Sequence, residues 1–148
     1  MKHHIFLRML VIVMLLSGCG APDSEQQIRD LIKTMAKAAE DEELRPIARA
    51  ISDDYRDLRD NDKASIVQTM RGVMFTTNGL LILPDIQKIE IITENFAEVS
   101  VRVRFAGADW ERLRLRGSSY LFELELAKDG SDWLVVSARW APGDGEPR

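Results

Sequence analysis

The sequence predicts an α+β domain in which N-terminal helices pack on the apolar face of an antiparallel sheet. Apolar residues recur at helical spacing between residues 24 and 78, and an alternating strand pattern replaces this spacing after Gly79. Turn signals, Glu94-Asn95 and Asp129-Gly130, then separate successive strands. Because the helices precede the strands in one block, the segregated α+β arrangement is favoured over an alternating α/β fold.

Two helices are expected at the start of this domain. Ser24 followed by Gln27 matches a capping box, which predicts a first helix from Ser24 to about Glu40. A second, shorter helix follows over residues 43–51, because Pro46 is tolerated only in the first turn of a helix. The next segment, residues 52–60, carries four aspartates and predicts a loop with a short strand.

A third helix is predicted after this loop, with Asp60 or Asn61 as its cap and Asn78-Gly79 as its end. The apolar run 80–84 between this helix and the sheet is either a buried connection or an exposed lip for a partner, and burial is the default expectation. Four strands follow, over Ile86–Thr93, Phe96–Phe105, Ser118–Lys128 and Trp133–Trp140. Their alternating pattern predicts a sheet with one dry face and one wet face.

The first eighteen residues have the features of a secretory signal. Lys2 and Arg8 give a positive start, the run 9–16 is wholly apolar, and the small residues Ser17 and Gly18 follow. A membrane-spanning helix needs about 20 apolar residues, so a run of this length predicts a signal segment, residues 1–18, and not a membrane span.

The sequence Leu16-Ser17-Gly18-Cys19 resembles the lipobox of bacterial lipoprotein precursors, and Cys19 is the only cysteine of the chain. The resemblance implies that Cys19 carries a diacylglyceryl thioether and an N-acyl chain such as palmitate, which anchors the protein to a membrane. An ordinary secretory signal is the alternative. The tether 19–23 would hold the domain within roughly 15 Å of its anchor. The resemblance also implies a place in the bacterial cell envelope, and Gly20 favours the periplasmic face of the outer membrane over the inner membrane.

Composition excludes several classes of function. Residues 19–148 hold 18 basic and 24 acidic side chains, a net charge of −6, and no histidine. Without histidine or an internal thiol, Ser-His-Asp and Cys-His catalysis, ordinary zinc sites and disulfides are excluded, and we expect neither a metal nor a cofactor. The net charge and the predicted export disfavour nucleic acid as a partner.

The order of three helices, a long meander and the closing strand Trp133-Leu134-Val135-Val136 resembles the nuclear-transport-factor-2-like (NTF2-like, SnoaL-like) family over residues 24–140, with 141–148 as a polar tail. The resemblance implies a cone in which the helices cover a curved sheet. Another small envelope domain of cystatin-like shape is the alternative. The family includes isomerases and dehydratases whose pockets use Asp, Tyr and often His. Since histidine is missing, Asp54 and Tyr55 are the weak catalytic candidates, with Asp53 beside them.

Basic side chains gather on the predicted second strand and just after it. At strand spacing such arginines can present forked donors to a phosphate or carboxylate group. A solvated ladder of ion pairs with Glu98, Glu123 and Glu125 is one alternative, and a surface that binds anionic lipid or glycan is another. The partner-binding candidates are Arg102, Arg104, Trp110, Arg112, Arg114 and Arg116.

Methionine and aromatic side chains on the inward faces of the helices predict either a filled core or a pocket for a small apolar ligand. The pocket candidates are Met35, Tyr55, Met70, Met74, Phe75 and Phe96.

Together these features favour a non-enzymatic, lipid-anchored interaction module that binds another envelope protein, in the manner of small immunity proteins that block a toxic effector. A carrier or sensor of a small apolar ligand is the second hypothesis. An isomerase or dehydratase that uses Asp54 and Tyr55 is the third. A homodimer formed through the sheet would compete with a protein partner for the same surface.

Overall fold

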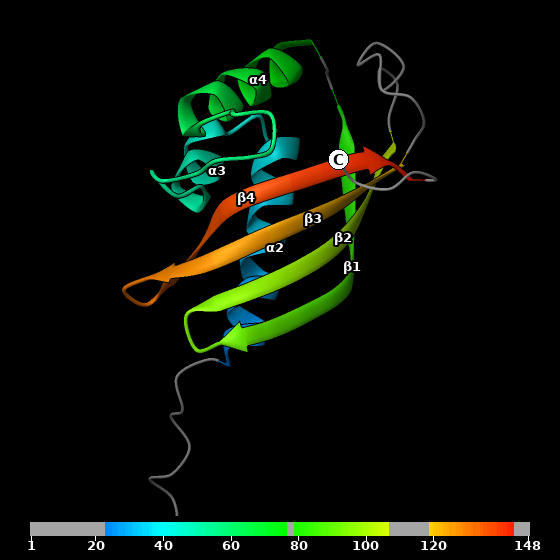
Figure 1. The fold of residues 1–148 in the computed structure, drawn as a ribbon. Helices are drawn as coiled ribbons and strands as arrows, with labels where there is room; N and C mark the ends of the chain where they lie inside the picture. The colour runs from blue at the N-terminus through cyan, green and yellow to red at the C-terminus, as the bar shows by residue number, and fades with distance from the viewer. Residues whose placement is uncertain (1–22, 77–78, 107–118, 144–148) are drawn as a thin grey trace, which may run out of the picture.

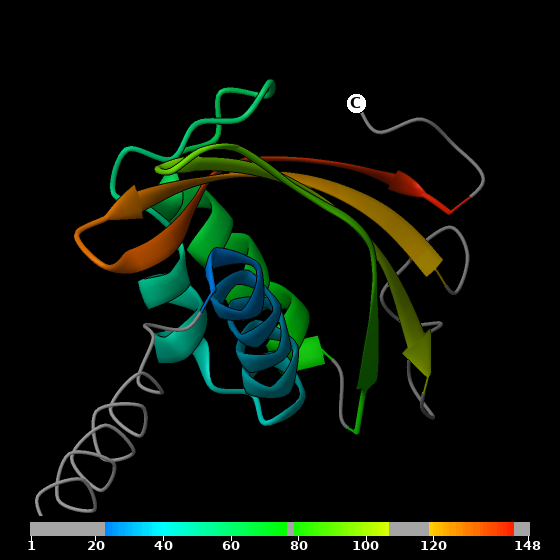
Figure 2. The ribbon, with the colours of Figure 1, turned by 90° about the horizontal axis from the view of Figure 1, so that it is seen from below.

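The computed structural model describes residues 23–76, 79–106 and 119–143, and confirms the α+β class. Helices come first and a sheet follows, and the sheet arches over the helices as a curved layer (Figures 1 and 2). In chain order the elements are α2 (Ser24–Glu40), α3 (Leu44–Ala50), α4 (Lys63–Thr76), β1 (Leu81–Thr93), β2 (Phe96–Ala106), β3 (Ser119–Asp129) and β4 (Asp132–Pro142).

The strands form one antiparallel sheet in the order β1-β2-β3-β4, so each strand pairs with its neighbour in sequence. Gly130, with φ of +62°, sits in the turn between β3 and β4, where a left-handed backbone favours glycine. Strands β1 and β4 are the two edges of the described sheet. β4 continues to Pro142, two residues past the predicted end of this strand at Trp140.

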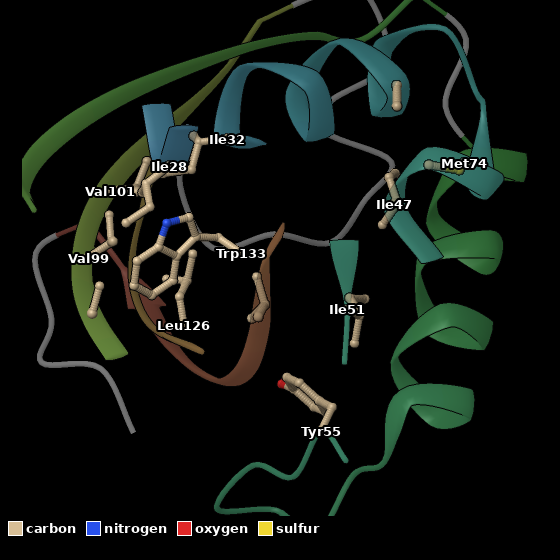
Figure 3. Packing of buried hydrophobic residues seen from close by; sticks show 13 residues of the cluster. Ile28, Ile32, Ile47, Ile51, Tyr55, Met74, Val99, Val101, Leu126 and Trp133 are labelled. Atoms are coloured by element: carbon tan, nitrogen blue, oxygen red, sulfur yellow. The ribbon is translucent and has the colours of Figure 1, made fainter. Parts of the chain in front are cut away.

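The core lies between the concave face of the sheet and the helices (Figure 3). The predicted alternation of β2 is confirmed, since Ala97, Val99 and Val101 are buried while Glu98 and Arg104 between and beyond them are exposed. In this cluster, large buried side chains of the helices and the following loop pack against those of the sheet. They include Ile28, Ile32, Ile47, Ile51, Tyr55, Leu126 and Trp133.

Both predicted helix caps are wrong by one or two residues. Asp23 and not Ser24 is the N-cap of α2, no side chain makes a capping hydrogen bond there, and the capping box does not form. At α4 the cap is Asp62, whose Oδ1 accepts hydrogen bonds from the Ser65 N–H (2.8 Å) and the Ser65 hydroxyl (2.7 Å). Ser65, three residues after Asp62, offers two donors to that carboxylate. Neither Asp60 nor Asn61 has a serine three residues after it.

The segment after α3 forms no strand of the sheet, contrary to the prediction for residues 52–60. It follows the edge of β4 instead. Ile51 makes a parallel bridge with Val135, the Ser52 N–H donates to the Val135 carbonyl (2.9 Å), and the Arg56 N–H donates to the Val136 carbonyl (3.0 Å). Through these hydrogen bonds, backbone groups of the loop occupy part of the β4 edge, which would otherwise have no neighbouring strand.

The apolar run 80–84 is not a buried connection, because β1 already begins at Leu81. Leu81 and Leu83 are 46% and 42% exposed, while Ile82 and Pro84 between them are half-buried. The default expectation of burial is therefore wrong for the two leucines. No helix in the described part of the chain is long and apolar enough to cross a bilayer. The predicted signal segment 1–18 and Cys19 lie outside the described residues.

Candidate functional site

A row of aromatic side chains crosses the concave face of the sheet beyond the core. The ring centroids of Phe105 and Tyr120 lie 6.2 Å apart, those of Tyr120 and Phe122 6.5 Å apart, and those of Phe122 and Trp140 6.2 Å apart with nearly parallel planes. Register places them on the helix-facing side, since Phe122 pairs with the buried Val101. All four are only half-buried, so this row presents aromatic surface.

Arg59 covers one end of the aromatic row. Its guanidinium carbon lies 5.1 Å from the Trp140 ring centroid, within the range of a cation–π contact. Arg59 belongs to the loop beside β4, and the exposed Leu58 precedes it with 75% of its surface accessible. The row therefore ends on a positive charge that a planar ligand with an anionic group can share.

Asp57 holds this loop in shape. Its Oδ1 accepts hydrogen bonds from the backbone N–H groups of Arg59 (2.8 Å) and Asn61 (3.0 Å), and its Oδ2 accepts one from the Asn61 side chain (2.9 Å). The Tyr55 hydroxyl also donates to Oδ2 (3.4 Å). Burial pushes the pKa of Asp57 up, but the hydrogen bonds from Asn61, Arg59 and Tyr55 outweigh it and hold that pKa below its usual value.

We expect Asp57→Asn to destabilise the domain at neutral pH and to weaken its acid dependence. A carboxylate with a lowered folded pKa contributes stability above its unfolded pKa of about 3.9, and this contribution is lost as the pH falls through the folded value. Denaturant unfolding at pH 7 and pH 3 measures the difference. Asp54→Asn, at an exposed position in the same segment, is the control. Equal acid dependence of the Asp57 variant and the unmodified chain would contradict this role.

The structure does not bring the catalytic candidates together. Tyr55 is 2% exposed, and its burial among core residues, with Asp57 nearby, raises the pKa of its hydroxyl. Asp54 is exposed, and Asp53 is exposed and pairs with Lys63 at 2.7 Å. A hydrogen bond from Lys63 lowers the pKa of Asp53. An isomerase needs a buried carboxyl beside a proton donor, and these two aspartates do not provide one.

The pocket candidates divide between core and surroundings. Met74 and Tyr55 belong to the buried cluster, and Met35 and Met70 pack against it half-buried. Phe96 is half-buried at the start of β2, and the side chain of Phe75 lies outside the described residues. The methionines therefore fill the core, and the exposed apolar surface on the concave side comes from the strands.

The convex face carries two of the arginine candidates at one end. Arg104 is exposed opposite Leu83, and Arg102 is half-buried opposite Asp85, with its Nη1 donating to the Gly143 carbonyl (3.2 Å). The exposed leucines of β1 share this end, and we call Leu81, Leu83, Arg102 and Arg104 the leucine–arginine patch. Trp110, Arg112, Arg114 and Arg116 lie outside the described residues.

The other end of the convex face is a ladder of charges, but its cations are Lys88 and Arg139 and not the arginines that the alternative interpretation of the sequence pairs with Glu98, Glu123 and Glu125. Arg139 pairs with Glu123 across β3 and β4 at 2.8 Å, and Lys88 pairs with Glu90 along β1 at 2.5 Å. A shallow groove of about 170 Å³ runs over this ladder. Within the described ranges no group of three or more His, Cys, Asp or Glu side chains could hold a metal ion.

Sequence reasoning missed the aromatic row and Arg59. The alternating pattern of the strands places Phe105, Tyr120 and Phe122 on the dry face, and the register confirms that placement. The sequence does not show that the helices leave these three rings half-exposed, because that exposure depends on how the helices pack on the sheet. One signal that could have indicated the row is the presence of aromatic residues on consecutive strands, since Phe122 and Trp140 pair across β3 and β4.

No protein-family profile matches the chain, and no curated protein sequence is significantly similar to it. Solved structures do resemble it. A cystatin-like domain of unknown function from Nostoc punctiforme is 14% identical, with a TM-score of 0.62 over 80% of this chain and 76% of that one. An NTF2-like protein of unknown function from Shewanella oneidensis is 13% identical, with a TM-score of 0.64 over 80% of this chain and 98% of that one.

A candidate scytalone dehydratase from Novosphingobium aromaticivorans is 11% identical, with a TM-score of 0.63 over 83% of this chain and 89% of that one. At such low identities the likeness concerns the backbone, since one fold hosts many activities. The chain has the NTF2-like, cystatin-like cone fold.

Proposed function

We propose that this chain is a non-enzymatic, lipid-anchored binding protein of the bacterial cell envelope, which engages a partner protein through the leucine–arginine patch. The observation that carries the proposal is the pair of exposed leucines, Leu81 and Leu83, beside Arg104 on the convex face. Exposed apolar patches mark interaction sites on soluble domains, and arginine is enriched at protein interfaces.

The anchor rests on the lipobox-like sequence around Cys19 and on the short tether that follows it. Two or more acyl chains on one cysteine give stable membrane attachment, whereas a single chain gives marginal binding. The domain would then work close to the membrane surface, on the periplasmic side of the outer membrane.

The non-enzymatic part is supported by the placement of Asp54 at the surface and of Tyr55 in the core. The patch favours a partner with acidic side chains around an apolar centre, since Arg102 and Arg104 supply positive charge beside the leucines. An effector whose active site is blocked by such binding, as with small immunity proteins, fits this chemistry.

A carrier or sensor of a small planar ligand is the second candidate function. The aromatic row on the concave face favours it, because half-exposed rings that end on Arg59 suit a flat apolar molecule with a negative group. This candidate uses the opposite face of the sheet from the leucine–arginine patch, so the two can be tested separately.

Affinity capture from an envelope extract of the native organism tests both candidates. The bait is the chain with Cys19→Ser, and the eluate is divided for peptide and small-molecule mass spectrometry. We expect a stoichiometric partner that is lost, by about ten-fold or more, with Leu83→Asp and with Arg104→Glu, but retained with Arg71→Glu on α4. A partner that still binds both patch variants contradicts the patch. A ligand that is lost with Trp140→Ala, without any protein partner, favours the carrier.

A further inference from the structure

Strand β1 is an open edge of the described sheet, and it carries most of the apolar surface that the domain leaves exposed. Within the described residues five large hydrophobic side chains are exposed, and four of them belong to β1, the other being Leu58. The four are Leu81, Leu83, Ile91 and Ile92. Figure 1 shows β1 along the border of the sheet, with no labelled strand beyond it. Such an edge is a template for another strand.

The first part of this edge is closed. The Ile82 N–H donates to Glu40 Oε1 at 2.8 Å, so the last residue of α2 occupies one outward-facing donor of β1. Pro84, two residues further along, has no N–H to offer. A side-chain cap and a proline are two devices that natural sheets use against unwanted pairing.

The second part of the edge, from Lys88 to Ile91, carries no such cap or proline and lies between two register shifts of β1, at Ile86/Lys88 and at Ile91/Thr93. In an antiparallel pair, residues alternate between those bonded to the neighbouring strand and those whose backbone groups point away from it. The backbone N–H of Ile82 points away from β2, because it bonds to a helix side chain, and Ile82 pairs with Phe105 of β2. Val99 and Ala97 lie an even number of residues from Phe105 on β2, so they share its orientation, and they pair with Ile89 and Ile91 respectively. The backbone groups of Ile89 and Ile91 therefore point out of the edge.

The charges beside this open edge are unbalanced. Glu90 lies opposite Glu98, and Glu98 lies opposite Glu125, so three carboxylates form a row across β1, β2 and β3. Like charges directly opposite one another destabilise a sheet. Lys88 pairs with Glu90 along the same strand at 2.5 Å and is exposed, and the row ends at the open edge where a further cation can approach.

We propose that a second copy of this chain pairs with β1 in antiparallel orientation over residues 87–91, the stretch between the two register shifts, with Ile89 opposite Ile89 of the second copy. In this register Lys88 of each copy lies beside Glu90 of the other, so the two-fold contact adds a cation to each row of carboxylates. The outward backbone groups of Ile89 bond reciprocally across the two-fold axis, and the two sheets become one continuous sheet.

This pairing leaves the convex face uncovered. A dimer that stacked two sheets face to face would bury the leucine–arginine patch, whereas an edge-to-edge dimer keeps it available to the proposed protein partner. The two proposals therefore stand or fall independently, because one rests on the edge at Ile89 and the other on the face at Leu83 and Arg104.

Charge reversal with rescue tests the pairing, on the chain with Cys19→Ser. Sedimentation velocity over a range of concentrations should show a dimer whose dissociation constant rises about ten-fold or more in Lys88→Glu and in Glu90→Lys, since each places like charges opposite. An equimolar mixture of the two variants should dimerise again, because every contact in the mixed pair joins opposite charges. Arg71→Glu, which changes the net charge on α4 by the same amount as Lys88→Glu does on β1, should dimerise like the unmodified chain.

Hydrogen exchange adds a readout at the edge itself. The amides of Ile89 and Ile91 should become protected as the concentration of the chain rises. A chain that stays monomeric at every concentration overturns the proposal. So does a dimer that Lys88→Glu leaves unchanged, since that dimer uses another surface, and so does a mixture of the two variants that fails to associate.

Discussion

Replacing Trp133 with alanine is expected to lower the free energy of unfolding by about 3–5 kcal/mol. The indole is 3% exposed and packs among Ile28, Val101 and Leu126, where the first helix meets the sheet (Figure 3). A small domain is stable by about 5–15 kcal/mol, so the variant loses a large part of its stability. Denaturant unfolding followed by circular dichroism measures the change.

Trp133→Phe is the matched control for this prediction. The Nε1–H of Trp133 is buried and has no acceptor among the described residues, which costs about 1–3 kcal/mol. Phenylalanine fills most of the space and removes that donor, so the expected loss is smaller, about 1–2 kcal/mol. If the phenylalanine and alanine variants were equally unstable, packing of the ring would not be the main contribution of this residue.

Cys19→Ser is expected to move the protein from the membrane fraction to the soluble fraction. Each methylene of an acyl chain buried in the bilayer contributes about 0.8 kcal/mol, and serine has no thiol to accept a diacylglyceryl group. Cell fractionation with metabolic labelling by palmitate measures both the position and the modification.

Ser17→Ala keeps a small residue in the lipobox-like sequence, so that variant should stay labelled and membrane-bound. An ordinary secretory signal makes the opposite prediction for Cys19→Ser, namely no change in fractionation or labelling. Gly20→Asp, in turn, should shift the protein towards the inner membrane, because the lipoprotein resemblance implies that an aspartate directly after the cysteine marks retention there.

The sequence was sufficient for the order and type of the elements because each depends on local periodicity. The spacing of Ile28 and Ile32 predicts α2, and the alternation of Val99 and Val101 predicts β2, whatever lies around them. The cap of α4 was misplaced because three consecutive polar residues can cap a helix, and the choice of Asp62 depends on the donors of Ser65.

The candidate site was less predictable because exposure is a property of packing between distant segments. Leu83 belongs to an apolar run, and only the register that pairs it with Arg104 places it on the convex face. Trp140 can be recognised from the sequence as an aromatic residue of the last strand. Its contact with Arg59 cannot, because that contact requires the loop to follow the edge of β4. Such contacts join residues far apart in the chain, where periodicity carries no information.

The bridge between Ile51 and Val135 has a consequence for the order in which the chain acquires its structure. The four strands are joined as consecutive hairpins, so each can pair as soon as its neighbour is present, with little loss of chain entropy. The loop after α3 differs, because the backbone of Ser52 and Arg56 bonds to β4, the last strand of the described chain to be synthesised. A chain that stops before β4 therefore leaves this loop without its backbone partners and the apolar face of α3 open to aggregation.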